Sequence, residues 1–294
     1  MINLEIDVKD RQGVSQRKVI LDKVGIDIVH GCQLRCVGCP NSTLKPKIRK
    51  MHPETFSKVV ENINVDHVNI LRLFNFGEPL LNEHLPEILE ILKNRKWTCS
   101  NIEISTNAQY HDFETLERAV KTQVINTFNV SCDGDGTPES YERLRPPSRW
   151  EKLIEFLHKL KSIRDKNDPN LILMTRVICN DEESQYRWLS ILKPLGFRVE
   201  FRDWLYLPES SVNMTGKAIA VPEGICSFLR PGNRLYIDHD GTIVPCCAHP
   251  KAAVLGNILE NKFSEVFRSE QRASVLHFMK QKRNEMKICN ECPY

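Results

Sequence analysis

The sequence predicts an α/β protein in which parallel strands form an incomplete barrel or an open curved sheet, followed by a small cysteine-bearing domain. From about Val24, short apolar runs alternate with longer amphipathic runs, which is typical of parallel strands joined by helical crossovers. This rhythm stops after about Leu205, and a separate group of five cysteines follows. We therefore expect an N-terminal extension (1–21), a barrel-like domain (22–205) and a small domain (206–294).

Six strand–helix units follow one another along the chain. The expected strands are apolar runs of strand length, at 24–29, 67–74, 101–106, 124–132, 171–179 and 197–204. The expected helices have apolar residues at helical spacing, at 53–63, 82–95, 113–121, 149–163 and 183–196. Pro53 suits a first helical turn. In the small domain, 208–216 predicts a loop, Asp240-Gly241 between apolar runs predicts a hairpin, and 263–283 predicts a helix.

The composition argues against several classes of partner. The 294 residues include 41 basic and 38 acidic side chains, and the formal net charge of +3 gives no case for nucleic acid or an anionic membrane. No apolar run approaches the roughly 20 residues of a membrane span. The polar N-terminus lacks the apolar core of a signal peptide. Since 41% of the residues are hydrophobic, we expect a soluble, cytoplasmic protein with a packed core.

Eleven cysteines are many for a cytoplasmic chain, and their clustering indicates metal binding. Without an export signal, a disulfide framework is the weaker interpretation. Cys99, Cys132 and Cys179 are isolated, and we interpret them as small buried apolar side chains. The remaining cysteines form two groups, one of Cys32, Cys36 and Cys39 and the other of Cys226, Cys246, Cys247, Cys289 and Cys292.

The first group has the spacing C-x3-C-x2-C within HGCQLRCVGCP (30–40), directly after the first expected strand. Functional groups gather at the C-terminal ends of parallel strands, so this position favours function. Three thiolates can hold three irons of a [4Fe–4S] cluster and leave the fourth iron open, whereas an electron-transfer cluster normally has four cysteine ligands. A zinc site is the alternative, although structural zinc sites have four ligands, and His30 is a candidate for a fourth ligand.

Short motifs at the ends of the following strands make the sequence resemble the radical S-adenosylmethionine (radical SAM) enzymes. NFGEPLL (75–81) resembles the family's Gly-Gly-Glu-Pro motif, and SCDG (131–134) resembles its Ser-x-Asp-Gly pattern. STN (105–107) lies where the family contacts its cofactor. With the three cysteines, these motifs stand in the family's order, each at a strand end. The resemblance covers about residues 22–205 and implies a partial (β/α)6 TIM-like barrel.

The resemblance implies that S-adenosylmethionine chelates the open iron through its amino and carboxylate groups. The backbone at Gly77 and the carboxylate of Glu78 suit the cationic amino group, and Ser105, Asn107 and Ser131 suit the ribose and the carboxylate. An electron from an external donor such as flavodoxin or ferredoxin yields a 5′-deoxyadenosyl radical. This radical abstracts hydrogen from an unactivated C–H bond, while the protein positions the substrate.

Two positions depart from the family's pattern. Phe76 replaces the first glycine of Gly-Gly-Glu-Pro, while Gly77, Glu78 and Pro79 are intact. Gly38 stands where the family usually has an aromatic residue, just before the third cysteine. The second departure leaves stacking on the adenine to other groups.

The second cysteine group resembles the family's C-terminal SPASM extension in its shorter twitch form. GTIVPCC (241–247), GNI (256–258) and CNEC (289–292) carry this resemblance. Because the chain stops at Tyr294, we expect one auxiliary [4Fe–4S] cluster rather than two. By analogy with similar enzymes, its ligands are Cys226, Cys246, Cys289 and Cys292, with zinc as the alternative.

Cys247 is the surplus cysteine of the second group, although the sequence leaves open which of Cys246 and Cys247 is the ligand. A thiol that faces the substrate could donate a hydrogen atom to a substrate carbon radical, and the alternative is a packed or spare thiol. Arg176 interrupts an apolar strand, and its partner is either the carboxylate of cofactor or substrate or an internal carboxylate. Asp203 and Trp204, at the end of the sixth strand, are further candidates of this kind.

Three functions from different classes are consistent with these motifs. The favoured one is an enzyme acting on a small hydroxylated substrate such as a sugar or aminocyclitol, with epimerisation through Cys247 slightly preferred over dehydrogenation. The second is a peptide or protein maturase that forms thioethers, crosslinks or oxidised residues. The segment before residue 22 has no room for a leader-peptide-binding domain, which lowers this interpretation. The third is a non-catalytic iron–sulfur or zinc protein.

Overall fold

The computed structural model describes residues 5–9, 15–109, 112–179, 181–229 and 232–294, with side chains from Arg17 onward. Its main feature is one ten-stranded sheet in the order β12-β11-β10-β2-β5-β6-β7-β8-β9, with β1 (Glu5–Lys9) beside β2. Two further strands, β3 (Val29–His30) and β4 (Arg49–Lys50), form a separate small sheet. No helix within the described ranges is long and apolar enough to span a membrane.

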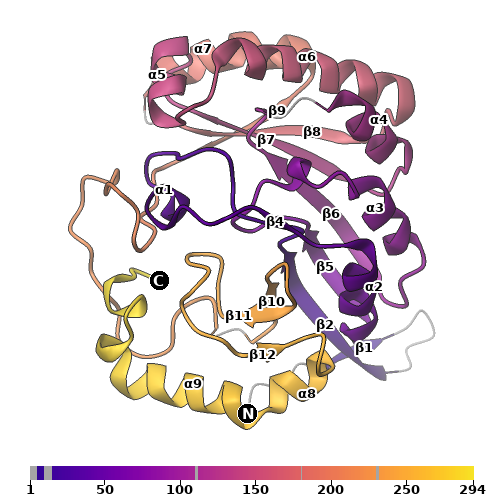
Figure 1. The fold of residues 1–294 in the computed structure, drawn as a ribbon, viewed down its shortest axis with the longest axis vertical. Coiled ribbons are helices and arrows are strands. Elements are labelled where there is room, and N and C mark those ends of the chain that lie inside the picture. Colours follow the sequence, from indigo (N-terminus) through magenta and orange to yellow (C-terminus); the bar gives the residue numbers. More distant parts are fainter. Residues whose placement is uncertain (1–4, 10–14, 110–111, 180, 230–231) are drawn as a thin grey trace.

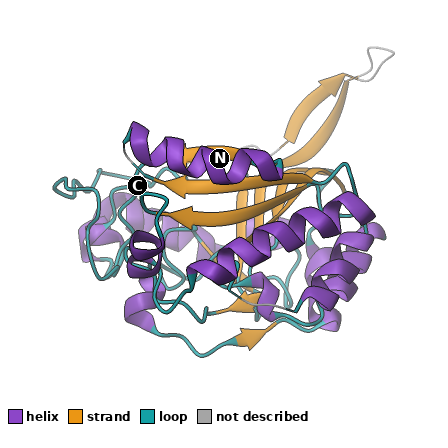
Figure 2. Cartoon of the chain, turned by 90° about the horizontal axis from the view of Figure 1, so that it is seen from above, coloured by secondary structure: helices purple, strands orange, loops and turns teal. Residues whose placement is uncertain are grey.

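Six parallel strands form the centre of the large sheet, in agreement with the prediction. They are β2 (Ser15–Ile26), β5 (His67–Arg72), β6 (Thr98–Thr106), β7 (Thr127–Asp133), β8 (Ile172–Ile178) and β9 (Arg198–Arg202). The first strand differs from the expected 24–29, because it begins at Ser15 and ends at Ile26. Its first half pairs with β1 as a ribbon that projects from the body of the molecule (Figure 2).

The crossover helices cover the outer face of the curved sheet (Figure 1). They are α2 (Pro53–Asn62), α3 (Leu85–Lys93), α4 (Phe113–Lys121), α6 (Trp150–Asn167) and α7 (Glu182–Leu192). Two begin at aspartate caps, because Asp112 accepts from the Thr115 amide and Asp181 from the Ser184 amide. Their apolar faces bury residues such as Phe56 and Trp188 against the sheet.

Two short helices escaped sequence prediction. These are α1 (Pro40–Leu44) and α5 (Pro138–Leu144), both too short to show a periodic apolar pattern. Both flank the first cysteine group: Cys39 is the N-cap of α1, and the end of α5 contacts the cysteine loop. Single 3-10 turns lie at Pro79–Leu81, Lys193–Leu195, Arg283–Glu285 and Cys289–Glu291.

The inner face of the sheet is polar. Side chains alternate along a strand, so buried residues such as Ile102 and Ile104 face the helices while Glu103 between them faces inward. The strand register aligns Arg72 with Glu103 and Arg176 with Glu200. The barrel interior therefore carries charged groups at mid-height.

The C-terminal hairpin continues the sheet of the barrel, which the sequence did not predict. β10 (Arg234–Ile237) pairs in parallel with β2, and β11 (Thr242–Val244) and β12 (Gly256–Asn257) follow outward. The predicted turn at Asp240-Gly241 is present, with Gly241 at φ +82°. This left-handed conformation favours glycine.

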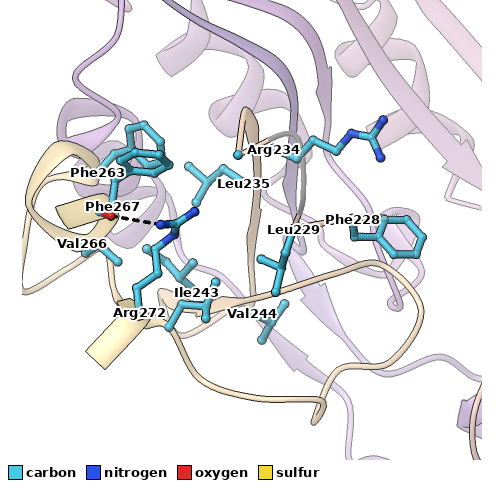
Figure 3. Close-up of a pocket in the computed structure, with 12 residues that line it drawn as sticks. Phe228, Leu229, Arg234, Leu235, Ile243, Val244, Phe263, Val266, Phe267 and Arg272 are labelled. Carbon is cyan, nitrogen blue, oxygen red and sulfur yellow. Dashed lines mark hydrogen bonds between the residues drawn. The ribbon is translucent and has the colours of Figure 1, made fainter. Parts of the chain in front are cut away.

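The single helix expected over 263–283 is in fact two helices, α8 (Phe263–Arg268) and α9 (Glu270–Lys282). Ser269 between them has extended backbone, and its side chain caps α9 by accepting from the Arg272 amide. Arg272 lies over the Phe267 ring at 4.1 Å and donates to the Phe267 carbonyl (Figure 3). The surrounding cavity is lined mainly by apolar side chains of α8 and the hairpin, so we interpret it as packing within the small domain.

Candidate active site

The first cysteine group lies at the carboxyl ends of the strands, beside a cavity of about 410 Å³. This cavity brings together the residues that the sequence assigned to the first cluster and to S-adenosylmethionine. They are Cys32, Cys36, Cys39, Gly77, Glu78, Ser105, Asn107 and Ser131. Arg176, Asp203 and Trp204 line the same cavity.

The cysteine loop is held by backbone hydrogen bonds and by hydrogen bonds to the sulfur of Cys32. The amides of Arg35 and Val37 donate to the carbonyls of Pro146 and Leu144 at 2.6 and 2.8 Å. The sulfur of Cys32 accepts from the Leu34 amide at 3.4 Å and from the side-chain amide of Asn107 at 3.3 Å. These donors stabilise a thiolate at Cys32, as expected for an iron ligand.

The chemistry of the three thiols fits an iron–sulfur cluster. Burial raises the pKa of Cys32 to about 12 and that of Cys36 to about 11, and it also raises the pKa of Cys39. The charges of Cys36 and Cys39 raise the pKa of Cys32 further, and that of Cys39 raises the pKa of Cys36. Such a group becomes a set of thiolates when a cation neutralises it, and the irons of a cluster supply this charge.

Gly77 is the position where the NFGEP loop crosses the cysteine loop. A Cβ at Gly77 would lie 1.6 Å from the carbonyl oxygen of Val29, so any side chain there would displace the backbone. The backbone of the loop is fixed by Asp27, whose Oδ1 accepts from the amides of Asn75, Phe76 and Gly77 at 2.7, 3.0 and 3.1 Å. Sequence reasoning missed Asp27, although an acidic residue within the apolar run VGIDIV was a signal of the same kind as Arg176.

Glu78 is buried, and protein groups engage its carboxylate. It accepts from the Leu80 amide at 3.1 Å, from the Thr106 hydroxyl at 2.7 Å and from the Asn107 amide at 2.7 Å. Burial nevertheless raises the pKa of Glu78 to about 7. Glu78 therefore ties the NFGEP loop to the STN segment, whereas the sequence had assigned its carboxylate to the amino group of the cofactor.

A buried ion pair adjoins the cysteine loop. Asp133, the aspartate of SCDG, pairs with Arg145 at the end of α5, and both side chains are buried. The Arg145 guanidinium favours the thiolates of Cys36 and Cys39. The SCDG motif contains Asp133, but the sequence did not indicate a role for it or for Arg145, because this partner lies outside any motif.

Arg176 takes part in an internal charge network, one of the two alternatives that the sequence left open. It donates to Glu200 at 3.2 Å and to Glu103 at 3.4 Å, while Arg72 donates to Glu103 at 2.9 Å. Arg202 pairs with Glu200 at 2.6 Å. Burial and the neighbouring Arg72 lower the pKa of Arg176, which indicates an interior rich in positive charge.

An aromatic ring lies beside Gly38, where the family pattern lacks one. A Cβ built on Gly38 would lie 3.5 Å from the ring of Trp204. Trp204 also lines the cavity that holds the three cysteines. The missing aromatic side chain is thus replaced in space by a residue from the end of the sixth strand unit.

The second cysteine group lies around another cavity. Four of its five cysteines line this cavity in the described structure, and the fifth does not. Cys226, Cys246, Cys289 and Cys292 line this cavity and are each 7% exposed. Four thiols around one cavity suit a cationic cluster, which offsets the burial that raises the pKa of Cys246 to about 12 and of Cys289 to about 11. The buried guanidinium of Arg283 fixes the terminal segment by donating to the carbonyls of Cys289 and Cys292.

Cys247 does not line the cavity of the other four. Its side chain is hydrogen-bonded to Tyr236, and this bond together with burial raises the pKa of Tyr236. The thiol also lies near Lys23 on β2, whose pKa is lowered by burial and by Arg72 and Arg234. Cys247 therefore lies beside residues of β2 and β10, although it directly follows the proposed ligand Cys246 in the chain.

His30, a candidate ligand from the sequence, does not line the cavity of the three cysteines. Its Nδ1 is 3.2 Å from both carboxylate oxygens of Asp238, and this hydrogen bond raises the pKa of His30. His239 binds the same carboxylate at 3.0 Å. The side chain of His30 thus links the cysteine loop to the C-terminal hairpin.

Comparisons with known proteins agree with this arrangement. Residues 26–197 match the radical SAM superfamily, and residues 226–293 match SPASM, an iron–sulfur cluster-binding domain. No curated protein matches the chain. The fold is similar to BtrN in complex with AdoMet and 2-DOIA, at 16% identity over 93% of both chains with a TM-score of 0.55.

A second similar structure is native anSMEcpe with bound AdoMet, at 15% identity over 92% of this chain and 88% of that chain with a TM-score of 0.62. The same protein with AdoMet and the Cp18Cys peptide has a TM-score of 0.59 at 15% identity, over 93% and 88% of the chains. At these identities the likeness concerns the fold. The superfamily match covers more than half of the chain. This protein is therefore an enzyme of the radical SAM superfamily with a SPASM domain, and its cofactors are a [4Fe–4S] cluster, S-adenosylmethionine and auxiliary iron–sulfur clusters in the SPASM domain.

Proposed function

We propose that the enzyme removes hydrogen from a carbinol carbon of a small hydroxylated substrate and epimerises that carbon, with Cys247 as hydrogen-atom donor. The observation that carries the proposal is that Cys247 does not line the cavity of the other four cysteines. A ligand set of Cys226, Cys246, Cys289 and Cys292 is complete without it. Its thiol is then free to act on the substrate.

The neighbours of Cys247 support this role. The ring of Tyr236, which is hydrogen-bonded to Cys247, lies 3.0 Å from a Cβ built on Gly25. In the strand register Gly25 is aligned with Arg72, whose side chain joins the internal charge network. These contacts link the thiol through Tyr236 to the strands whose side chains form the internal charge network, although Cys247 itself does not line the cofactor cavity.

When bound, the first cluster and S-adenosylmethionine supply the 5′-deoxyadenosyl radical, which takes the substrate hydrogen. Cys247 gives its S–H hydrogen atom to the opposite face of the resulting carbon radical, so a C–H bond forms as an S–H bond breaks. The sulfur radical that remains needs one electron and one proton to return to the thiol. An external donor of the flavodoxin or ferredoxin class provides the electron, and solvent provides the proton, with Tyr236 holding the side chain in place.

The interior charge bears on the kind of substrate. Among the described residues, the three arginines Arg72, Arg176 and Arg202 form ion pairs with two carboxylates, those of Glu103 and Glu200. A site with surplus positive charge repels a cationic ligand and attracts an anionic one. We therefore favour a neutral or acidic sugar, such as one bearing a carboxylate or phosphate, over a cationic aminocyclitol.

Dehydrogenation is a second candidate, favoured by Lys23. Burial and two nearby arginines lower the pKa of Lys23, and this amine is a candidate base for the substrate hydroxyl proton. In that reaction the substrate loses a hydrogen atom to the 5′-deoxyadenosyl radical, a proton to Lys23 and an electron to the auxiliary centre. Peptide modification is a further alternative, because one neighbouring structure holds a peptide while another holds 2-DOIA.

Turnover in deuterated water separates these functions. Epimerisation through an exchangeable thiol places one deuterium on the product carbon, whereas dehydrogenation releases a ketone or aldehyde without that label. The Cys247→Ala variant should still form 5′-deoxyadenosine from S-adenosylmethionine but should lose the labelled epimer. A labelled epimer from Cys247→Ala contradicts the role of the thiol, and a well-loaded wild-type sample that forms no 5′-deoxyadenosine with any substrate contradicts the catalytic assignment.

A further inference from the structure

A strongly basic segment follows the first cysteine group directly. Residues 45–50, with the sequence KPKIRK, contain four cationic side chains, and we call this segment the basic loop. Lys47, Arg49 and Lys50 are exposed, and Ile48 among them is 44% exposed. The backbone carbonyls of Pro46 and Lys47 pack against Gly31, the neighbour of Cys32. The basic loop is therefore attached to the cysteine loop itself.

A cavity of about 230 Å³ lies between the basic loop and the small domain. Lys47 and Arg49 line one side, and Lys251 with Pro250 lines the other. His30 and Gly31 also line it, next to Cys32 in the sequence. The cavity therefore lies beside the first cysteine group, between the barrel domain and the small domain.

This basic cavity and the cavity of the three cysteines share lining residues. Asn41 and Phe76 line both of them. The side-chain amide of Asn41 donates to the Phe76 carbonyl at 2.7 Å, which holds these two residues together. A molecule bound at the basic cavity would therefore be close to the first cluster, and electron transfer is fastest over short distances.

The charge at this surface is not balanced by neighbouring acids. Within the part of the chain that the structure describes, Lys45, Lys47, Arg49 and Lys251 have no ion-pair partner. Lys50 pairs with Glu83, and Asp238 is occupied by His30 and His239. The basic loop and Lys251 thus bring four cations without an ion-pair partner among the described residues to one surface.

We propose that the basic loop and Lys251 form the docking surface for an acidic one-electron donor protein of the flavodoxin or ferredoxin class, which reduces the first cluster. Opposite charges steer such encounters and raise the association rate. The exposed Ile48 within a ring of cations matches an interface with an apolar centre and a charged rim. The proposal rests on membership of the superfamily and holds for either reaction of the substrate.

Rapid-mixing spectroscopy tests this surface on the reconstituted holoenzyme. The triple variant Lys47→Glu, Arg49→Glu, Lys251→Glu is mixed with reduced flavodoxin, and the bleaching of the cluster absorbance is followed at several salt concentrations. We expect at least a tenfold slower second-order rate at low salt and loss of the salt dependence, since steering contributes about 10- to 1000-fold. The neutral triple variant with glutamine at the same three positions should fall between this variant and the wild type.

Two controls separate docking from other effects. A triple variant at distant exposed positions, Lys152→Glu, Lys193→Glu, Lys280→Glu, carries the same charge change and should be reduced at the wild-type rate. Dithionite, a small reductant that needs no docking surface, should reduce every variant equally and support the same yield of 5′-deoxyadenosine.

Four results would overturn the proposal. One is an unchanged flavodoxin rate in the first triple variant, and another is an equal loss in the distant control. A third is slower reduction by dithionite, because the charges would then act on the cluster itself. The fourth is a wild-type enzyme that dithionite reduces but neither flavodoxin nor ferredoxin reduces. None of these outcomes depends on the identity of the substrate, so they are distinct from a failure of the proposed epimerisation.

Discussion

Replacing Asp27 by alanine should damage the cofactor site without touching any proposed ligand. Asp27 is 2% exposed, and its carboxylate accepts from three consecutive backbone amides of the NFGEP loop. Asp27→Ala leaves these three donors unpaired, at about 1–3 kcal/mol each. Allowing for relaxation of the loop, we expect a loss of about 3 kcal/mol in the free energy of unfolding. Since Gly77 belongs to this loop, the affinity for S-adenosylmethionine should fall at least tenfold.

The effect of pH on Asp27 has a definite sign. Burial raises the pKa of Asp27 from 3.8 to about 7 in the folded protein, so the folded state holds the proton more tightly than the unfolded state. The stability contributed by the protonated form is fully present below pH 4 and is lost as the pH rises through 7. A shift of this size corresponds to at most about 4 kcal/mol. Asp27→Asn cannot ionise and keeps an oxygen acceptor, so its stability relative to the wild type should improve as the pH rises from 5 to 8.

Thermal unfolding and equilibrium dialysis measure these effects under anaerobic conditions. At about 2 °C per kcal/mol, Asp27→Ala should lower the Tm by about 6 °C. Dialysis against S-adenosylmethionine gives the change in Kd, and Asp27→Asn serves as the matched control with a smaller change. The reasoning is refuted if Asp27→Ala has a Tm within 1 °C of the wild type and an unchanged Kd between pH 6 and 8.

Three further variants test other parts of the two sites. Gly77→Ala should bind S-adenosylmethionine at least tenfold more weakly by dialysis, because the new methyl group would lie 1.6 Å from the carbonyl oxygen of Val29, and a wild-type Kd would contradict the backbone assignment. Trp204→Leu should raise the same Kd severalfold while the iron content stays constant, if the indole replaces the missing aromatic contact to adenine. Cys246→Ser should reduce the iron content from about eight to about four per chain, whereas Cys247→Ser should retain about eight; the reverse pattern would exchange the two cysteines.

The strands and the first cysteine group could be predicted from sequence because their signals are local. Apolar runs and the spacing of Cys32, Cys36 and Cys39 are visible within a few residues of the chain. The pairing of β10 with β2 is a contact across some 200 residues, and no short window of sequence records it. The break at Ser269 was missed for another reason, because the apolar spacing continues on both sides of a residue that itself caps the second helix.

The same difference between local and long-range signals applies to the residues of the site. Gly77, Asn107 and Ser131 belong to motifs and were found, and the structure brings them to one cavity. Asp27 and Arg145 act through partners elsewhere in the chain, and only an unexpected charge in an apolar run could have indicated the first. Arg176 was found through such a charge, but the choice between a ligand and an internal partner required the positions of Glu103 and Glu200.

The parallel pairing of β10 with β2 has a consequence for how this enzyme can be divided. Residues 234–237 cover the backbone edge of Lys23–Ile26, which would otherwise be an open strand. Unpaired strand edges promote association between chains. A fragment that ends near residue 205 should therefore aggregate rather than behave as an independent catalytic module. The SPASM segment thus pairs with the exposed edge of the sheet in addition to binding iron–sulfur clusters.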